Sequence, residues 1–302
     1  MTEIAADHAG SPRWQAIGAL VFGACVIGFS GVLVRLTGTG PAAAGVWRLV
    51  VALPLLAAMT RRADGALGRP APIVWLTGLF FALDLGFWHY GLKFTSVGAS
   101  TVLSNLASVV VTAAAWIFLK QRPRPLFLVA LAVAVAGAWL IGLGRGAGTP
   151  VPNAPLGALL SLATAFWYAL YLVTVAQGRR TQTASHLMFW SGVIGAPLLL
   201  AAALLLGERI LPATPAGLAA CAALGLVHVG GQGSIAWAMG RLPASLASVV
   251  LLVQLVVATY VGWLLFGEAL GPMQAAGAGI ALAGVILAQW ASRGSRPAAP
   301  AQ

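Results

Sequence analysis

Charged residues are scarce in this sequence. Asp, Glu, Lys and Arg make up 8% of its 302 residues and 60% are hydrophobic, whereas soluble globular domains carry roughly one quarter charged residues. The six acidic residues are too few for a cluster of carboxylates that would hold metal ions. These shortages exclude an ordinary water-soluble domain as the main part of the chain.

Motifs of enzyme chemistry are also missing. The sequence contains no GxSxG, no HExxH and no glycine-rich phosphate loop followed by Lys. Its two cysteines, Cys25 and Cys221, lie inside apolar stretches without paired spacing, which is typical of small packing residues rather than of a metal site. We therefore expect no enzyme activity, no metal and no cofactor.

Long apolar stretches fill almost the whole chain. Each is close to the roughly 20 residues that cross a ~30 Å hydrocarbon core as a helix. Pro, Gly and charge clusters separate ten of them, at residues 15–35, 41–59, 72–92, 96–119, 125–143, 156–176, 186–206, 215–239, 244–266 and 272–290. This pattern predicts an all-α membrane protein with ten transmembrane helices and leaves no room for a separate soluble domain. The first stretch has no small-residue cleavage site, so we expect it to be retained rather than removed as a signal peptide.

The positive charges follow the gaps between the apolar stretches. A net charge of +11 could suggest nucleic-acid binding, but the basic residues form no face with interleaved aromatics, so topology explains them better. With a cytoplasmic N-terminus, twelve Lys and Arg fall on the cytoplasmic side and four on the other. The four are Arg35, Lys93, Arg145 and Arg209. The positive-inside rule then predicts a multi-pass protein of the inner membrane with both termini in the cytoplasm.

An internal repeat appears when the segment from Ser96 is laid on the segment from Pro243. Val102, Val109, Val110, Thr112 and Trp116 then match Val249, Val256, Val257, Thr259 and Trp263, and Pro125, Ala136 and Gly137 match Pro272, Ala283 and Gly284. If each half holds five spans, the second half enters the membrane upside down relative to the first. This predicts two inverted five-helix repeats at 15–145 and 155–290, between cytoplasmic tails at 1–14 and 291–302, with a site near the midplane where the halves meet.

Several segments resemble the EamA-type repeats of the drug/metabolite transporter superfamily. They are GFSGVLVRL, VWRLVVALPLL, FALDLGFWHYGLKFTSVGAS, GRLPASLASVVLLVQ and FGEALG. The resemblance implies ten helices in two inverted halves around a central cavity, in a protein that exports small metabolites. Where the family often has Pro in the fourth and ninth helices, this chain has Ser108 and Leu255, and Gln121 replaces a frequent Glu. A proline kink and a first-half glutamate with a coupling role are therefore not implied.

Three ionisable residues lie near the middle of predicted spans: Arg48, Asp84 and His228. Such groups cost at least ~2.5 kcal/mol in the hydrocarbon core, so they are the first candidates for a substrate or proton site. Burial favours the neutral form of Asp84, whereas a nearby Arg48 favours its charged form, and this balance suits proton coupling. The alternatives stay open: Arg48 and Asp84 could form an ion pair that only fixes helix packing, and His228 could be an interhelical hydrogen bonder.

Polar and aromatic residues extend this candidate site along four helices. At 100° per residue, Thr101, Asn105, Ser108 and Thr112 share one face of the fourth helix. Trp88 shares a face with Asp84, Gln232 shares one with His228, and Thr164, Trp167, Tyr168 and Tyr171 make an aromatic face of the sixth helix. Hydroxyl residues can also hold helices together without any substrate, and Trp and Tyr can serve as packing or interfacial residues. Arg35 and His89 lie near span ends, where we expect snorkelling towards the headgroups.

Taken together, the sequence predicts a secondary transporter that exports a small, amino-acid-like or similar amphipathic metabolite. Its expected partners are that solute and the lipid bilayer, with proton coupling at Asp84 as a hypothesis. The central-cavity candidates are Arg48, Asp84, Trp88, Asn105, Ser108, Trp167, Tyr171, His228 and Gln232. A membrane-embedded enzyme acting on lipid would need a nucleophile or metal constellation, and a structural or sensory subunit without flux would have a dry interior. These remain the alternatives.

Overall fold

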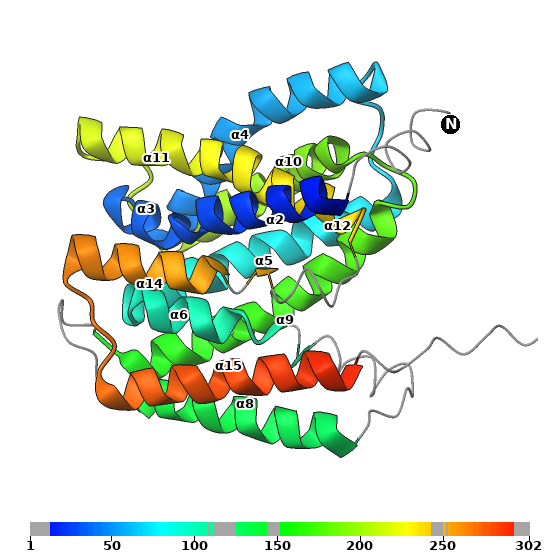
Figure 1. The fold of residues 1–302 in the computed structure, drawn as a ribbon. Helices are drawn as coiled ribbons and strands as arrows, with labels where there is room; N and C mark the ends of the chain where they lie inside the picture. The colour runs from blue at the N-terminus through cyan, green and yellow to red at the C-terminus, as the bar shows by residue number, and fades with distance from the viewer. Residues whose placement is uncertain are drawn as a thin grey trace, which may run out of the picture.

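The computed structural model describes residues 13–107, 109–110, 125–143, 152–242, 250–251 and 253–292, and the elements in these ranges are helices (Figure 1). They are α2 Arg13–Gly28, α3 Ser30–Leu36, α4 Pro41–Asp64, α5 Pro72–Phe94, α6 Val97–Ser104, α8 Pro125–Leu143, α9 Ala154–Gly178, α10 Ala184–Leu205, α11 Pro215–Val227, η1 His228–Gln232, α12 Gly233–Met239, α14 Val253–Phe266 and α15 Pro272–Ser292.

Within the described ranges, six helical segments are long and apolar enough to cross a membrane. They are Trp14–Leu36, Pro41–Asp64, Pro72–Phe94, Ala154–Val175, Ala184–Leu205 and Pro215–Met239, and Pro125–Ile141 and Val253–Phe266 are shorter apolar helices. Large apolar side chains such as Trp139, Leu205 and Val256 point outwards. A surface of this kind suits lipid rather than water, so the chain is a multi-pass membrane protein.

Local sequence explains where the helices begin. Pro41, Pro72 and Pro215 occupy first-turn positions, where a missing N–H costs nothing. The hydroxyl of Thr183 accepts a hydrogen bond from the His186 N–H at the start of α10. Equivalent caps are made by Ser96 at α6, Asn153 at α9 and Thr214 at α11.

Three of the predicted spans contain an interruption of the α-helix. The first span breaks at Phe29, whose N–H donates to the Val26 carbonyl in a tightened turn. The eighth contains the π-helix η1, with two adjacent glycines; a Cβ on Gly231 would lie 2.9 Å from the side chain of Ile27, so α2 packs closely there. Such π-segments are often found at functional sites.

The third interruption ends α6 at Ser104, followed by a turn at Asn105 and Leu106. The Ser104 hydroxyl and the Asn105 Nδ2 both donate to the Thr101 carbonyl, at 3.0 and 2.8 Å. Side chains of this type compete with the backbone for helical hydrogen bonds, which accounts for a break without proline. Of the predicted stripe, Thr101 and Asn105 are described, whereas Ser108 and Thr112 lie outside the described residues, so the stripe beyond Asn105 stays a prediction.

Close contacts join helices from the N-terminal and the C-terminal parts of the chain. α8 and α15 lie side by side (Figure 1), and a Cβ on Gly137 would meet the Ala281 backbone while one on Gly284 would lie 2.5 Å from the Ala134 N. α5 packs on α9, and α4 packs on α10. The central helices α2, α5, α6, α9 and α14 surround the cavity described next.

Candidate functional site

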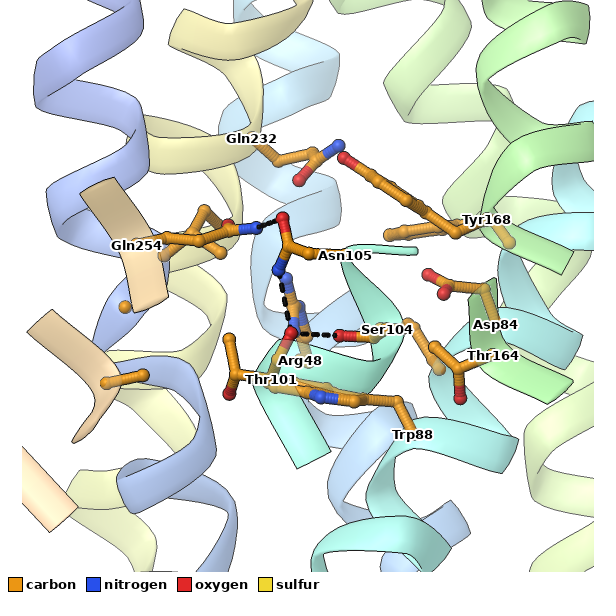
Figure 2. Close-up of a pocket in the computed structure, with 15 residues that line it drawn as sticks. Arg48, Asp84, Trp88, Thr101, Ser104, Asn105, Thr164, Tyr168, Gln232 and Gln254 are labelled. Carbon is orange, nitrogen blue, oxygen red and sulfur yellow. Dashed lines mark hydrogen bonds between the residues drawn. The ribbon is translucent and has the colours of Figure 1, made fainter. Parts of the chain in front are cut away.

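A cavity of about 70 Å³ lies among α2, α4, α5, α6, α9, η1 and α14 (Figure 2). Its lining is Ile27, Gly28, Arg48, Phe81, Asp84, Leu85, Trp88, Thr101, Ser104, Asn105, Thr164, Tyr168, Gln232, Gln254 and Ala258. One ordered water needs at least ~10 to 15 Å³ of such space, so the cavity has room for several waters. The helix interruptions lie around it, which fits the rule that irregular backbone at membrane depth is tolerated where it lines a cavity or is covered by protein.

Arg48 supplies the positive charge of this cavity. The residue is only 3% exposed, and its guanidinium carbon lies 6.0 Å from the centre of the Trp88 ring. Its Nε has no hydrogen-bond partner among the described residues. Buried polar groups are nearly always hydrogen-bonded, because a desolvated donor without an acceptor is costly. The guanidinium is therefore available for an acceptor that enters the cavity.

Asp84, which is 7% exposed, supplies a carboxyl group. Arg48 and Asp84 attract each other electrostatically. In the described part of the chain, their side chains are more than 4.0 Å apart and form no salt bridge, unlike those of Arg35 and Glu268. Both side chains face one cavity from different helices (Figure 2).

The wall opposite Asp84 is made of amides and hydroxyls. Gln254 Nε2 donates to Asn105 Oδ1 at 2.9 Å, and Asn105 Nδ2 donates to the Thr101 carbonyl (Figure 2). Thr101 Oγ1 is bonded to the Val97 carbonyl at 2.7 Å. These groups come from α6 and α14 and from the turn that follows α6.

Aromatic rings close the side of the cavity nearer α9. Tyr171 stacks on Phe81 with 4.7 Å between ring centres, and His228 stacks on Phe81 at 5.3 Å. The Gln232 side chain lies beside that of Tyr168 at the cavity (Figure 2). In the described part of the chain, both ring nitrogens of His228 are buried without a hydrogen-bond partner.

The structure brings most of the sequence-predicted residues together. Arg48, Asp84, Trp88, Asn105 and Gln232 line the cavity. Tyr171 and His228 lie behind Phe81, one ring away from it. Trp167 instead packs against Phe80 and Phe87, outside the lining, and Ser108 lies outside the described residues. Their roles in transport remain predictions.

Gln254 is the main residue that sequence reasoning did not select. Gln254 carries no charge and belongs to no polar stripe, because it is an isolated amide in the apolar run LLVQLVV. That isolation was itself a usable signal, because an amide in hydrocarbon needs a partner.

The end of the molecule that carries Glu208 and Glu268 is tightly bonded. Glu268 pairs with Arg35 and accepts the Val97 N–H at 3.0 Å. Glu208 accepts the N–H groups of Ala42 and Ala43, at 3.2 and 2.9 Å, and the Tyr90 hydroxyl. Both carboxylates thus occupy helix N-termini, where the helix dipole favours negative charge.

Arg35 and His89 do not snorkel to the headgroups, so that expectation is wrong. Arg35 donates to the carbonyls of Leu92 and Thr95 as well as to Glu268. His89 is buried, and its Nδ1 donates to the Pro41 carbonyl at 2.9 Å. Internal acceptors replace the headgroups for both side chains.

The opposite end holds a vestibule of about 1080 Å³. Its lining includes Asp64, Arg179, His186, Met188 and Ser234, and extends to Val229 and Gly230 of η1. Asp64 accepts a hydrogen bond from Thr183 at 2.9 Å. η1 therefore contributes residues to the vestibule on one side and Gln232 to the central cavity on the other.

Comparison with known proteins adds the following findings. The model of the EamA-like transporter family matches residues 14–143 and 155–290. A solved crystal structure, described only as that of a protein, is 19% identical to this chain. The match covers 91% of this chain and 97% of the solved chain, with a TM-score of 0.64. At that identity the likeness concerns the fold alone. No curated protein gives a significant match.

Proposed function

The chain belongs to the EamA-like transporter family, and from this premise we propose that it is a secondary transporter exporting a small, amino-acid-like amphipathic solute through the inner membrane. The family is one of membrane transporters rather than enzymes. Its match to two segments of the chain leaves the solute, the direction and the coupling to be argued from the site.

The observation that carries the proposal is the buried, unpaired charge in the cavity. Arg48 has a free Nε and Asp84 makes no salt bridge with it, yet both line the same space. Arginine binds carboxylates well because its planar guanidinium matches their geometry, and a carboxylate such as Asp84 accepts from an ammonium. Trp88 and Phe81 offer apolar surface between them. A solute with both charges and an apolar part fits this arrangement.

The proposed architecture is ten transmembrane helices in two inverted five-helix repeats. Gly137 and Gly284 are equivalent in the repeat register, as are Ala134 and Ala281; Gly137 meets Ala281 and Gly284 meets Ala134. Reciprocal contacts of this kind are expected across a two-fold axis, and they support the proposal.

A second reciprocal relation supports the same architecture. Glu208, beyond the end of α10, binds the N-terminus of α4, while Asp64, at the end of α4, binds the Thr183 cap of α10. α4 and α10 therefore meet with the acidic end of each near the N-terminus of the other, as an inverted repeat requires.

The direction of export is supported by the two ends of the molecule. The vestibule includes Asp64 and Arg179, which the positive-inside rule assigns to the cytoplasm. Glu208 and Glu268 close the end assigned to the outside. A solute would then load from the cytoplasm, and a change in the protonation of Asp84 would couple its movement to protons.

Counterflow in proteoliposomes tests the proposed function. Vesicles are preloaded with single amino acids or with purines, and uptake of the labelled solute is measured. We expect an amino-acid pool to drive uptake, and Arg48→Met to abolish it because the cavity loses its guanidinium. Arg61→Met, on an exposed part of the same helix, is the matched control and should retain uptake. Uptake with none of these pools, or full uptake by Arg48→Met, would contradict the proposal.

A further inference from the structure

A side-chain hydrogen bond joins the turn after α6 to α14 at the cavity. Gln254 Nε2 donates to Asn105 Oδ1 at 2.9 Å, between residues 149 positions apart in the chain. Asn105 follows the end of α6, and Gln254 is the second residue of α14. The bond therefore ties one half of the molecule to the other at a wall of the cavity (Figure 2).

The two amides differ in how firmly they are held. Asn105 is bonded twice, because its Nδ2 also donates to the Thr101 carbonyl. In the part of the chain that the structure describes, the Gln254 side chain makes only the bond to Asn105. An amide carries two donor hydrogens and an acceptor oxygen. Gln254 thus keeps hydrogen-bonding capacity for a solute, and both side chains are only half-buried and line the cavity.

The backbone of Gln254 is fixed while its side chain can turn. A Cβ on Gly28 would lie 3.2 Å from the Gln254 carbonyl oxygen and 2.7 Å from the Val257 side chain, so α14 packs directly on α2 here. Only glycine allows this approach. A change of hydrogen-bond partner by the Gln254 amide would therefore need a rotation of the side chain and no movement of the α2 and α14 backbones.

A carboxylate entering the cavity would compete for the Gln254 N–H. Arg48 lines the same cavity and attracts such a group, and a charged oxygen is a stronger acceptor than the neutral Asn105 carbonyl. Resting on the proposed transport function, we propose that Gln254 is a switchable ligand for the carboxylate of the transported solute. Asn105 holds it in the empty cavity, and solute binding releases the tie between α6 and α14.

The test measures binding without flux. The reporter is Ser104→Cys, a cavity-lining position, in a background with Cys25 and Cys221 replaced by Ala. Its reaction with N-ethylmaleimide is followed with increasing L-phenylalanine or 2-phenylethylamine, which share the ring and the amine but differ in the carboxylate. We expect L-phenylalanine to protect the thiol, and 2-phenylethylamine to be roughly 10-fold weaker or worse because it lacks the charged acceptor.

The two partners of the hydrogen bond should then have opposite effects. Asn105→Ala removes the competing acceptor, so the half-protecting concentration of L-phenylalanine should fall about 2- to 10-fold. Gln254→Leu removes the donor, so that concentration should rise about 10-fold. Gln177→Leu makes the same chemical change at an exposed position of α9 and should alter nothing.

Asn105→Asp covers the case in which Asn105→Ala does not fold. It keeps the shape and a stronger acceptor for Gln254, so it should raise the half-protecting concentration.

Equal shifts in the same direction for Asn105→Ala and Gln254→Leu would reduce the bond to a packing contact and overturn the proposal. Absence of protection by L-phenylalanine, or equal protection by 2-phenylethylamine, would overturn it too. Normal protection in a protein that shows no counterflow would instead contradict the transport function alone.

Discussion

At the scale of single residues, the unusual feature is two opposite charges that share a cavity without touching. A buried ion pair in contact satisfies itself, and replacing it by apolar residues is often neutral or stabilising. Arg48 instead has an Nε without a hydrogen-bond partner among the described residues, and both side chains line the cavity. The stability lost by leaving them unpaired is understandable if a solute or water completes the site.

The same geometry makes Asp84→Asn informative. If Asp84 carries the coupled proton, the variant should fold and exchange solute, but it should lose accumulation driven by a pH gradient, because Asn cannot take up and release the proton. The measurement is gradient-driven uptake and counterflow in the same proteoliposomes. Asp64→Asn, which makes the same change in the vestibule, should keep both activities.

A purely structural role of Asp84 predicts a different outcome. Removing one member of a buried pair costs roughly 3 to 5 kcal/mol, so the variant would be poorly produced. Purified Asp84→Asn that still accumulates solute along the gradient would rule out the coupling role.

Position near the middle of a predicted span pointed to Arg48 and Asp84 but not to the amide of Gln254. Arg48 and Asp84 were selected because charge is costly in hydrocarbon, and both line the cavity. Gln254 carries no charge and was missed. Trp167 was placed with Tyr171 by helical phase, but the two contact different rings of α5. The 100° rotation per residue predicts which face of α9 a ring lies on, but not which residues of α5 that ring contacts.

At the scale of elements, apolar length predicted most helices, whereas their interruptions depended on tertiary detail. The α6 break arises from Ser104 and Asn105 bonding back to Thr101, and no proline announces it. The π-helix at His228–Gln232 sits where Gly231 contacts α2. Neither contact can be read from hydropathy, because each depends on which groups meet in space.

The contact between α8 and α15 gives a prediction at this scale. A Cβ on Gly284 would lie 2.5 Å from the Ala134 backbone, whereas one on Gly279 of the same helix meets nothing within 4 Å. Gly284→Leu should therefore lower the free energy of unfolding by about 1 to 3 kcal/mol, because the added side chain overpacks the contact. Gly279→Leu carries the same gain in helix propensity and should be neutral or stabilising.

Thermal unfolding of the two purified variants in one detergent measures this difference. Equal melting temperatures for Gly284→Leu and Gly279→Leu would mean that α8 and α15 are not in close contact in the folded protein.

At the scale of the whole molecule, the two ends of the bundle differ. At one end, the carboxylates of Glu208 and Glu268 accept hydrogen bonds at helix N-termini, and the other end opens into the vestibule. An alternating-access carrier opens its site to one side at a time. The asymmetry therefore corresponds to a conformation that faces the side of the vestibule.

This asymmetry yields a prediction about sidedness, which also tests the topology expected from the charges. In a background without Cys25 and Cys221, Ser234→Cys in the vestibule should react with a membrane-impermeant maleimide in inside-out vesicles and not in intact cells. Lys93→Cys, exposed at the opposite end, should show the reverse pattern.

A reporter active only outside the cytoplasm, fused after Gln302, should give no signal. Labelling of Ser234→Cys in intact cells together with a signal from the Gln302 fusion would mean that the orientation is reversed. The same labelling with a silent fusion would mean that the protein rests with its site open to the outside.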